Sequence, residues 1–199
     1  ALFSNHAMKC WGAGSYQRLG YGTSTATIGN LPGSMGANLP FLTFPDNEEV
    51  TSIALGQRAT CAITISRKGY CWGFNHWYRQ IAPDGNNQIT HPAPPILNGA
   101  YPVVAIALSY INTCAILDVG GGVHNVYCIG KNSNYINSGS SGTTYQDFTR
   151  VEIGYVDFVP VKLFANWHGD DFGKAAAMCA VDAAGRAKCW GMDNSGVLL

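Results

Sequence analysis

The chain has 199 residues and a formal net charge of zero, with 47% hydrophobic and only 12% charged residues. A chain without an excess of Lys and Arg lacks the basic surface that nucleic-acid binding needs, and no apolar run is long enough to cross a membrane as a helix. We therefore exclude nucleic acid as a partner and membrane insertion as a mode of attachment. Charged residues are about half as frequent as in typical soluble domains, which suggests a surface covered by neighbouring chains or by sugar.

Short apolar runs bounded by Gly, Pro, Ser and Asn dominate the chain, which predicts an all-β fold. In chain order, we expect strands within 1–10, 40–45, 50–74, 103–130, 151–164 and 175–191. The stretches 23–48, 76–100 and 131–150 are rich in turn residues, and we interpret them mainly as surface loops.

One phrase recurs about every sixty residues, and such self-similarity is the signature of repeat architectures. It consists of an apolar strand, a strand of small residues, a turn and a third strand that ends in a tripeptide of the form Cys-Trp-Gly or Cys-Ile-Gly. These tripeptides are Cys10-Trp11-Gly12, Cys71-Trp72-Gly73, Cys128-Ile129-Gly130 and Cys189-Trp190-Gly191. A unit of this length fits one four-stranded propeller blade.

The repeat therefore predicts a partial β-propeller of about three four-stranded blades. We assign residues 1–22 to the C-terminal part of a truncated blade. The repeat units that follow are 23–84, 85–142 and 143–199, the last of them incomplete at its end.

The spacing of the cysteines predicts three local disulfides. Two pairs share one spacing, and the third is longer by a glycine-rich insertion at 119–122. Each pair brackets a predicted hairpin, where directly opposed residues have Cα atoms about 4.5 Å apart, close enough for a disulfide. The predicted disulfides are Cys61–Cys71, Cys114–Cys128 and Cys179–Cys189. The alternative is reduced cysteines in the core, and metal binding is disfavoured because no Cys-x-x-Cys spacing occurs.

Cys10 is left unpaired in this chain. By the spacing of the other pairs, its partner would be the residue just before Ala1. We therefore expect these residues to be an excerpt of a longer propeller chain. Paired cysteines favour an oxidising compartment, so we expect an extracellular or cell-surface location.

The phrase resembles the repeat of the regulator of chromosome condensation family, whose members are seven-bladed propellers. In the first complete unit the matching residues are Val50 to Gly56, Thr60-Cys61-Ala62-Ile63, Gly69, Cys71-Trp72-Gly73 and Asn75. The paired cysteines are similar to the extracellular variety of this repeat, as in crinkly-type receptor ectodomains. Nothing matches the family's nucleotide-exchange or chromatin-binding residues, so the resemblance implies the fold and not that activity.

The tryptophans of the closing tripeptides, Trp11, Trp72 and Trp190, are expected to pack between blades. Each can bury on the order of 200 Å². The glycine after each of them suits a bend where a side chain would clash.

No catalytic constellation is visible, so we predict a non-enzymatic chain with no cofactor and no metal. His168 and Asp170 form the most site-like cluster, but a solvated turn is the better interpretation. The loop aromatics Trp77, Tyr78 and Trp167 could stack on sugars or fill a pocket on a partner.

We expect an extracellular protein-binding or structural module, such as a subunit of a surface assembly or filament. Its partners would be other protein chains, including further copies or the missing part of the same protein. The alternatives are a carbohydrate-binding propeller that recognises glycans and, less favoured, an enzyme with a site at the mouth of the channel.

Overall fold

A computed structural model of the chain describes residues 1–22, 27–75, 88–91, 95–109, 112–131, 145–154, 156–166 and 177–191. The described residues form β-strands and short 3-10 turns. The strands are β1 Gly12–Ala13, β2 Thr27–Ile28, β3 Val50–Leu55, β4 Ala59–Thr64, β5 Gly69–Phe74, β6 Gln88–Ile89, β7 Val103–Leu108, β8 Asn112–Asp118, β9 His124–Lys131, β10 Tyr145–Arg150, β11 Pro160–Ala165, β12 Ala177–Asp182 and β13 Ala187–Gly191. The 3-10 turns are Ser15–Gln17, Gly36–Asn38, Pro45–Asn47 and Ile96–Gly99.

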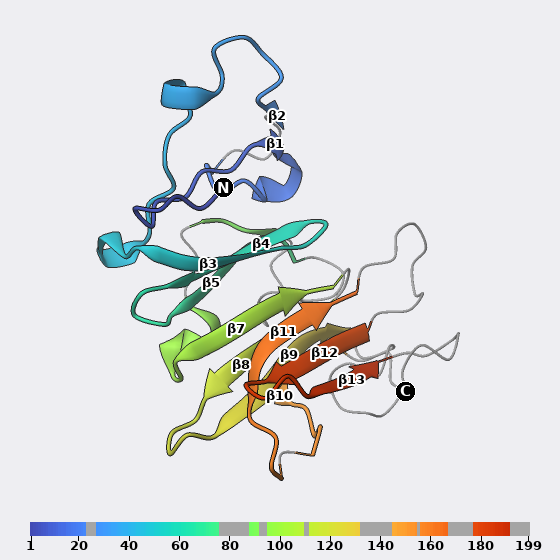
Figure 1. The fold of residues 1–199 in the computed structure, drawn as a ribbon. Helices are drawn as coiled ribbons and strands as arrows, with labels where there is room; N and C mark the ends of the chain where they lie inside the picture. The colour runs from blue at the N-terminus through green and yellow to red at the C-terminus, as the bar shows by residue number, and fades with distance from the viewer. Residues whose placement is uncertain are drawn as a thin grey trace.

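The strands form separate antiparallel sheets in which neighbours in sequence are neighbours in space. Two sheets have four strands, β3 to β6 and β7 to β10, and the sheet of β11 to β13 has three. β7 contacts both β3 and β11, so the first strands of the three sheets lie side by side (Figure 1). This is the arrangement of propeller blades, and the predicted all-β partial propeller is confirmed.

The sheets group the outer strands differently from the repeat boundaries that we placed at residues 84 and 142. β6 pairs with β5, and β10 pairs with β9, so each closes the preceding blade. Likewise β2 pairs with β1 of the first blade. These outer strands follow long connectors without alternating apolar residues, which is why the sequence pattern did not locate them.

The first blade repeats the register of the second. Leu2 and Met8 form a bridge at the places that Ile63 and Gly69 hold in the next repeat. The expected strand at 40–45 is reduced to a single bridge between Met8 and Leu42. Tertiary contact with Met8, rather than a full ladder, therefore holds this segment.

The glycine of each closing tripeptide has a backbone conformation that other residues rarely adopt. Its φ is 106° at Gly12, 116° at Gly73, 126° at Gly130 and 128° at Gly191. A Cβ on Gly73 would lie 2.5 Å from the Arg58 carbonyl oxygen. The expected clash is therefore present at Gly73, whereas nothing lies within 4 Å of an added Cβ at Gly12, where the positive φ alone favours glycine.

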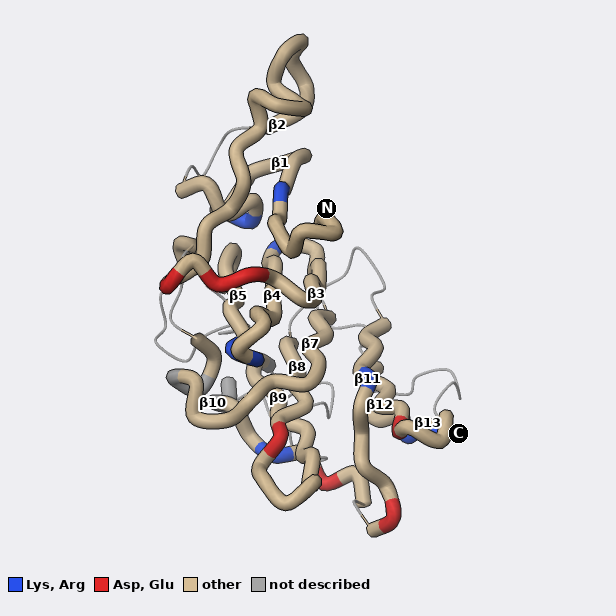
Figure 2. The backbone as a smooth tube through the Cα atoms, turned by 60° about the vertical axis from the view of Figure 1, so that its left-hand side comes forward, with Lys and Arg blue, Asp and Glu red and all other residues tan. Residues whose placement is uncertain are grey.

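The strands carry few charged side chains, and many Asp and Glu residues lie in the connections between them (Figure 2). The apolar core consists of clusters that lie between successive sheets rather than within one sheet. Blade-to-blade packing is therefore the main source of apolar burial, as the two-layer rule for sheets requires.

Candidate functional site

Each sheet has two distinct faces, because successive side chains of a strand point to opposite sides. We call the side with the cystine the disulfide face, and the side with Trp11, Trp72, Ile129 or Trp190 the tryptophan face. The two cysteines of each cystine are paired across neighbouring strands, and the residue paired with the first cysteine on the preceding strand extends this row. In the first two complete sheets that residue is an alanine, which gives the rows Ala54–Cys61–Cys71 and Ala107–Cys114–Cys128. In the last sheet that row is Phe164–Cys179–Cys189.

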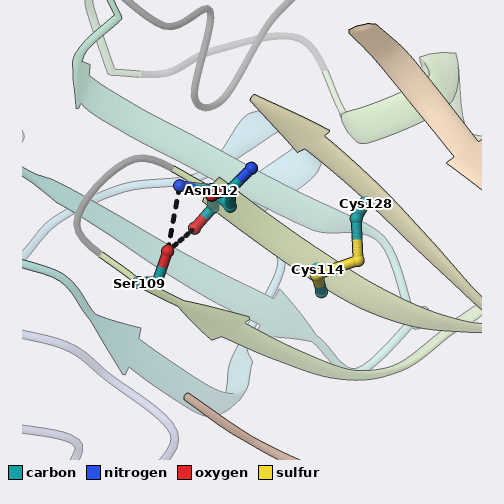
Figure 3. Close-up of a disulfide and its surroundings, with 4 residues drawn as sticks. All are labelled: Ser109, Asn112, Cys114 and Cys128. Atoms are coloured by element: carbon teal, nitrogen blue, oxygen red, sulfur yellow. Dashed lines mark hydrogen bonds between the residues drawn. A yellow bond between two sulfur atoms is a disulfide. The ribbon is translucent and has the colours of Figure 1, made fainter. Parts of the chain in front are cut away.

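Three disulfides join the cysteines that the spacing pairs. The S–S distances are 2.07 Å for Cys61–Cys71, 1.99 Å for Cys114–Cys128 and 2.02 Å for Cys179–Cys189. The Cα atoms are 4.1 Å apart in each pair, as suits directly opposed residues in a hairpin. Near the middle pair, the backbone N–H of Asn112 donates to the Ser109 hydroxyl at 3.0 Å across the β7–β8 connection (Figure 3).

Two of the disulfide faces are covered by the tryptophan face of the following sheet. Cys61 and Cys71 are 0% and 2% exposed, and they share a core cluster with Val103, Ile106 and Leu117 of the next blade. The second cystine is 0% exposed at both cysteines. It shares a cluster with Leu163 and Met178 of the last sheet, against which Trp190 also packs.

Trp72 fills the joint between the first blade and the sheet of β3 to β6. It is 0% exposed, and its Nε1 donates to the Arg18 carbonyl at 3.1 Å. The Thr60 hydroxyl donates to the same carbonyl at 2.8 Å. The ring centroids of Phe44 and His91 lie 6.0 and 4.6 Å from that of Trp72. Trp72 therefore packs between blades, where we expected it.

His91, which follows the outer strand β6, packs against Trp72 and Phe44 in this joint. A ring nitrogen, Nε2, lies 2.8 Å from the Thr43 carbonyl oxygen and donates to it. Nδ1 is buried without a hydrogen-bond partner among the described residues. Burial lowers the pKa of His91 below its ordinary value, and the hydrogen bond to Thr43 offsets part of that shift.

Trp11 does not occupy such a joint among the described residues, so its expected packing between blades stays a prediction. It is 49% exposed, because no sheet among the described residues covers the tryptophan face of the first blade. Cys10, on the opposite face, is free and buried, and burial raises the pKa of its thiol.

An apolar hollow of about 360 Å³ lies beside Trp11, and we call it the tryptophan hollow. Its lining includes Phe3, Lys9, Trp11, Met35 and Leu39. Phe41 stands at its edge, with its ring centroid 5.6 Å from that of Phe3. The Lys9 ammonium lies 4.2 Å from the Phe41 centroid and donates to the Gly36 carbonyl at 2.8 Å.

Several large side chains around the tryptophan hollow are exposed, although Leu39 in its lining is buried. Phe3 is 43% exposed, Met35 38% and Phe41 48%. The hollow thus combines aromatic, thioether and cationic groups in one exposed cluster. The sequence pattern did not indicate Phe3, Met35 and Phe41, because tertiary contacts such as the bridge between Met8 and Leu42 bring the connector beside the first hairpin.

The disulfide face of the last sheet is the second open surface. Phe164 is 55% exposed, Cys189 is exposed and Cys179 is half-buried. The corresponding cysteines of the other two sheets are buried under a following blade.

The remaining expected contacts lie outside the described residues. These are Trp77, Tyr78, Trp167, His168 and Asp170. In the part of the chain that the structure describes, no group of three or more His, Cys, Asp or Glu side chains could hold a metal ion. None of the described helical turns has the length and apolarity needed to span a bilayer.

No protein-family model matches the chain, and no curated protein matches its sequence. Solved structures do match. Human WBSCR16 shares 14% identity, with a TM-score of 0.63 over 95% of this chain and 44% of its own. Yeast RCC1 (Prp20) bound to Kap60 shares 17% identity, with a TM-score of 0.59 over 98% and 40%. The ectodomain of the Arabidopsis thaliana receptor kinase ACR4 also matches, at 17% identity and a TM-score of 0.42 over 75% and 39%.

The chain therefore has an RCC1-like propeller fold that carries disulfides. It spans less than half the length of these structures. At such low identity the likeness concerns the fold, and activity has to be argued from the open surfaces of this chain.

Proposed function

We propose that the chain is a non-enzymatic, extracellular protein-binding module that docks a protein partner at the tryptophan hollow. The observation that carries this proposal is the exposed cluster of Phe3, Trp11, Met35 and Phe41 around one hollow. Contiguous exposed apolar patches mark interaction sites, and aromatic residues and Met are enriched at protein interfaces.

Lys9 supplies a polar anchor within the apolar cluster. It is held by the Gly36 carbonyl and by the face of Phe41, so its ammonium is positioned before a partner arrives. Such preorganisation reduces the entropy lost on binding. Trp11 is the expected energetic centre, because tryptophan is the most enriched residue at binding hot spots.

Three disulfides support an extracellular location, because such bonds persist mainly in oxidising compartments. Solved neighbours with this fold bind proteins. One structure shows Kap60 bound to yeast RCC1, and another concerns the binding of Prp20p to Gsp1p and histones. These partners are not carried over, since the net charge of this chain is zero.

The test is photo-cross-linking from the rim of the hollow. A photoreactive phenylalanine analogue replaces Phe41 in one variant and Ile65, which is 61% exposed in the β4–β5 turn, in the control. We expect a cross-linked protein from the native cell surface at Phe41 only, and its loss in Trp11→Ala. Equal labelling from both positions, or none, would refute the proposal.

Carbohydrate binding is the second candidate, because Trp11 presents a half-exposed indole of the kind that stacks on sugars. The loop residues Trp77, Tyr78 and Trp167 remain candidates for the same role. Glycan-array binding that disappears in Trp11→Ala or Trp77→Ala would support it. A silent array together with protein cross-linking at Phe41 would exclude it.

A further inference from the structure

Two arginines face one tyrosine ring where the first blade meets the sheet of β3 to β6. The guanidinium carbons of Arg18 and Arg58 lie 5.9 and 5.6 Å from the centroid of the Tyr16 ring. Arg58 also lies 5.1 Å from the centroid of Phe74, whose ring is 4.6 Å from that of Tyr16. We call these four side chains the arginine cluster. It lies between the 3-10 turn Ser15–Gln17 and the adjoining ends of β4 and β5.

Arg18 is held in place before any ligand arrives. Its Nε donates to the Ser15 carbonyl at 2.8 Å, and its Nη1 donates to the Gln57 carbonyl at 2.8 Å. Its own carbonyl accepts the hydrogen bonds from Trp72 and Thr60 that close the joint. A guanidinium has more N–H donors than these two bonds use, so Arg18 can still donate to a ligand. Because its position is already fixed, little conformational entropy is lost on binding.

Positive charge accumulates in the arginine cluster. Among the described residues, the ion pairs belong to other cations, and no Asp or Glu pairs with Arg18. Burial lowers the pKa of Arg18, and the nearby charge of Arg58 lowers it further, while Tyr16 offsets part of that shift. Arg18 remains protonated, because the pKa of arginine lies far above neutral. An anionic group at the cluster would therefore relieve the repulsion between the guanidinium groups.

We propose that the arginine cluster is a binding site for an acidic peptide segment of a protein partner, which places a carboxylate against Arg18 and Arg58. The planar fork of a guanidinium matches a carboxylate and can bind it through two parallel hydrogen bonds. The site shares no residue with the tryptophan hollow. The proposal therefore goes beyond the proposed function and does not depend on docking at that hollow.

A compact anionic group fits the arginine cluster better than a long polyanion does. A sulfated or uronate polysaccharide binds along an extended track of positive charge. In the described part of the chain, Lys and Arg lie singly or in pairs at separate places along the backbone (Figure 2). The pair Arg67 and Lys68 is already matched by Asp118 and Glu48. This distribution of charge favours a few carboxylates of a peptide over a charged polysaccharide.

The test measures the binding of a short fluorescent peptide of consecutive Glu residues to the oxidised chain by fluorescence anisotropy. A peptide of Gln residues with the same length is the control ligand. At low salt, we expect the Glu peptide to bind at least about 10-fold more tightly than the Gln peptide, because charge-assisted hydrogen bonds are the stronger ones. Raising the salt to about 0.5 M should weaken this binding, because both arginines are only half-buried and salt screens exposed charges.

Variants locate the binding at the arginine cluster. Arg58→Gln removes one charge and should weaken binding of the Glu peptide by about 10-fold or more. Arg58→Lys keeps the charge but loses the planar fork, so it should bind with an intermediate affinity. Lys162→Gln removes the same charge from an exposed position on β11, in a different sheet, and should change the affinity by less than about 2-fold. Urea unfolding checks that each variant is folded, and Arg58→Lys decides the result if Arg58→Gln does not fold.

Several outcomes overturn the proposal. Equal affinity for the Glu and Gln peptides, or no binding of either, excludes an acidic-peptide site. A loss in Lys162→Gln equal to that in Arg58→Gln shows attraction by overall charge and not a site at the cluster. A sulfated oligosaccharide that binds more tightly than the Glu peptide, and loses that binding in Arg58→Gln, assigns the cluster to glycans. None of these results alters the cross-linking expected from Phe41, so failure of this site is distinguishable from failure of docking at the tryptophan hollow.

Discussion

Replacing Gly73 with alanine should lower the free energy of unfolding by about 2–6 kcal/mol. A residue other than glycine at a φ of 116° costs about 1–3 kcal/mol. The added Cβ would also lie 2.5 Å from the Arg58 carbonyl oxygen and 2.9 Å from the Ala59 Cα. The Arg58 carbonyl accepts a hydrogen bond from the Phe74 N–H at 2.9 Å, so it cannot move away from the added Cβ without weakening that bond. Overpacking therefore costs a further ~1–3 kcal/mol.

The matched control for this prediction is Gly36→Ala. Gly36 has a φ of 67° and nothing within 4 Å of the position of an added Cβ. Its substitution should cost only the backbone penalty, about 1–2 kcal/mol. Urea unfolding of the three proteins, followed by tryptophan fluorescence, compares the two costs. If Gly73→Ala is no more destabilising than Gly36→Ala, the steric argument is refuted.

Three further predictions concern the blade joints. Trp72→Phe should lower the free energy of unfolding by about 2–4 kcal/mol, because it removes buried volume and the hydrogen bond to the Arg18 carbonyl. Trp11→Phe should change the free energy of unfolding by less than about 0.5 kcal/mol. Similar losses in the two variants would contradict the assignment of Trp72 to the joint. The double variant Cys61→Ala/Cys71→Ala should be less stable by at least about 2.5–3 kcal/mol, which is the loop-closure free energy for this separation. An unfolding midpoint equal to that of the oxidised wild type would count against this prediction. The pKa of His91 is lowered in the fold, so the folded state favours the neutral ring. The stability that the neutral ring contributes is fully present above the ordinary pKa of about 6.5, and it is lost as the pH falls below that value. Unfolding midpoints at pH 7.5 and 5.5 should therefore differ more in the wild type than in His91→Gln, and equal differences would argue against this role.

The fold and part of the site follow from local pattern. Cys61 lies opposite Cys71 because of the register of the hairpin that contains them. That register depends on the turn and on the residues next to it. The same is true of the glycines after the tripeptides, whose positive φ values occur in every repeat. The three cystines and the propeller class were therefore predictable before any tertiary contact was known.

The open surfaces could not be predicted in this way. Trp11 and Trp72 follow identical local patterns, yet one is 49% exposed and the other is 0% exposed. Their difference depends on whether another blade lies against the face. Phe3 and Phe41 are far apart in sequence and meet only through tertiary contacts.

The sequence by itself determined what is local: the strands of each hairpin, the cystine that joins them and the glycine that bends the chain after the tryptophan. Only the tertiary structure decided which outer strand closes which blade, which tryptophan is covered and which faces remain open. The physical reason is that hairpin register depends on residues close together in the chain. Burial, in contrast, depends on which distant surface packs against a face, and that information is absent from the repeat itself.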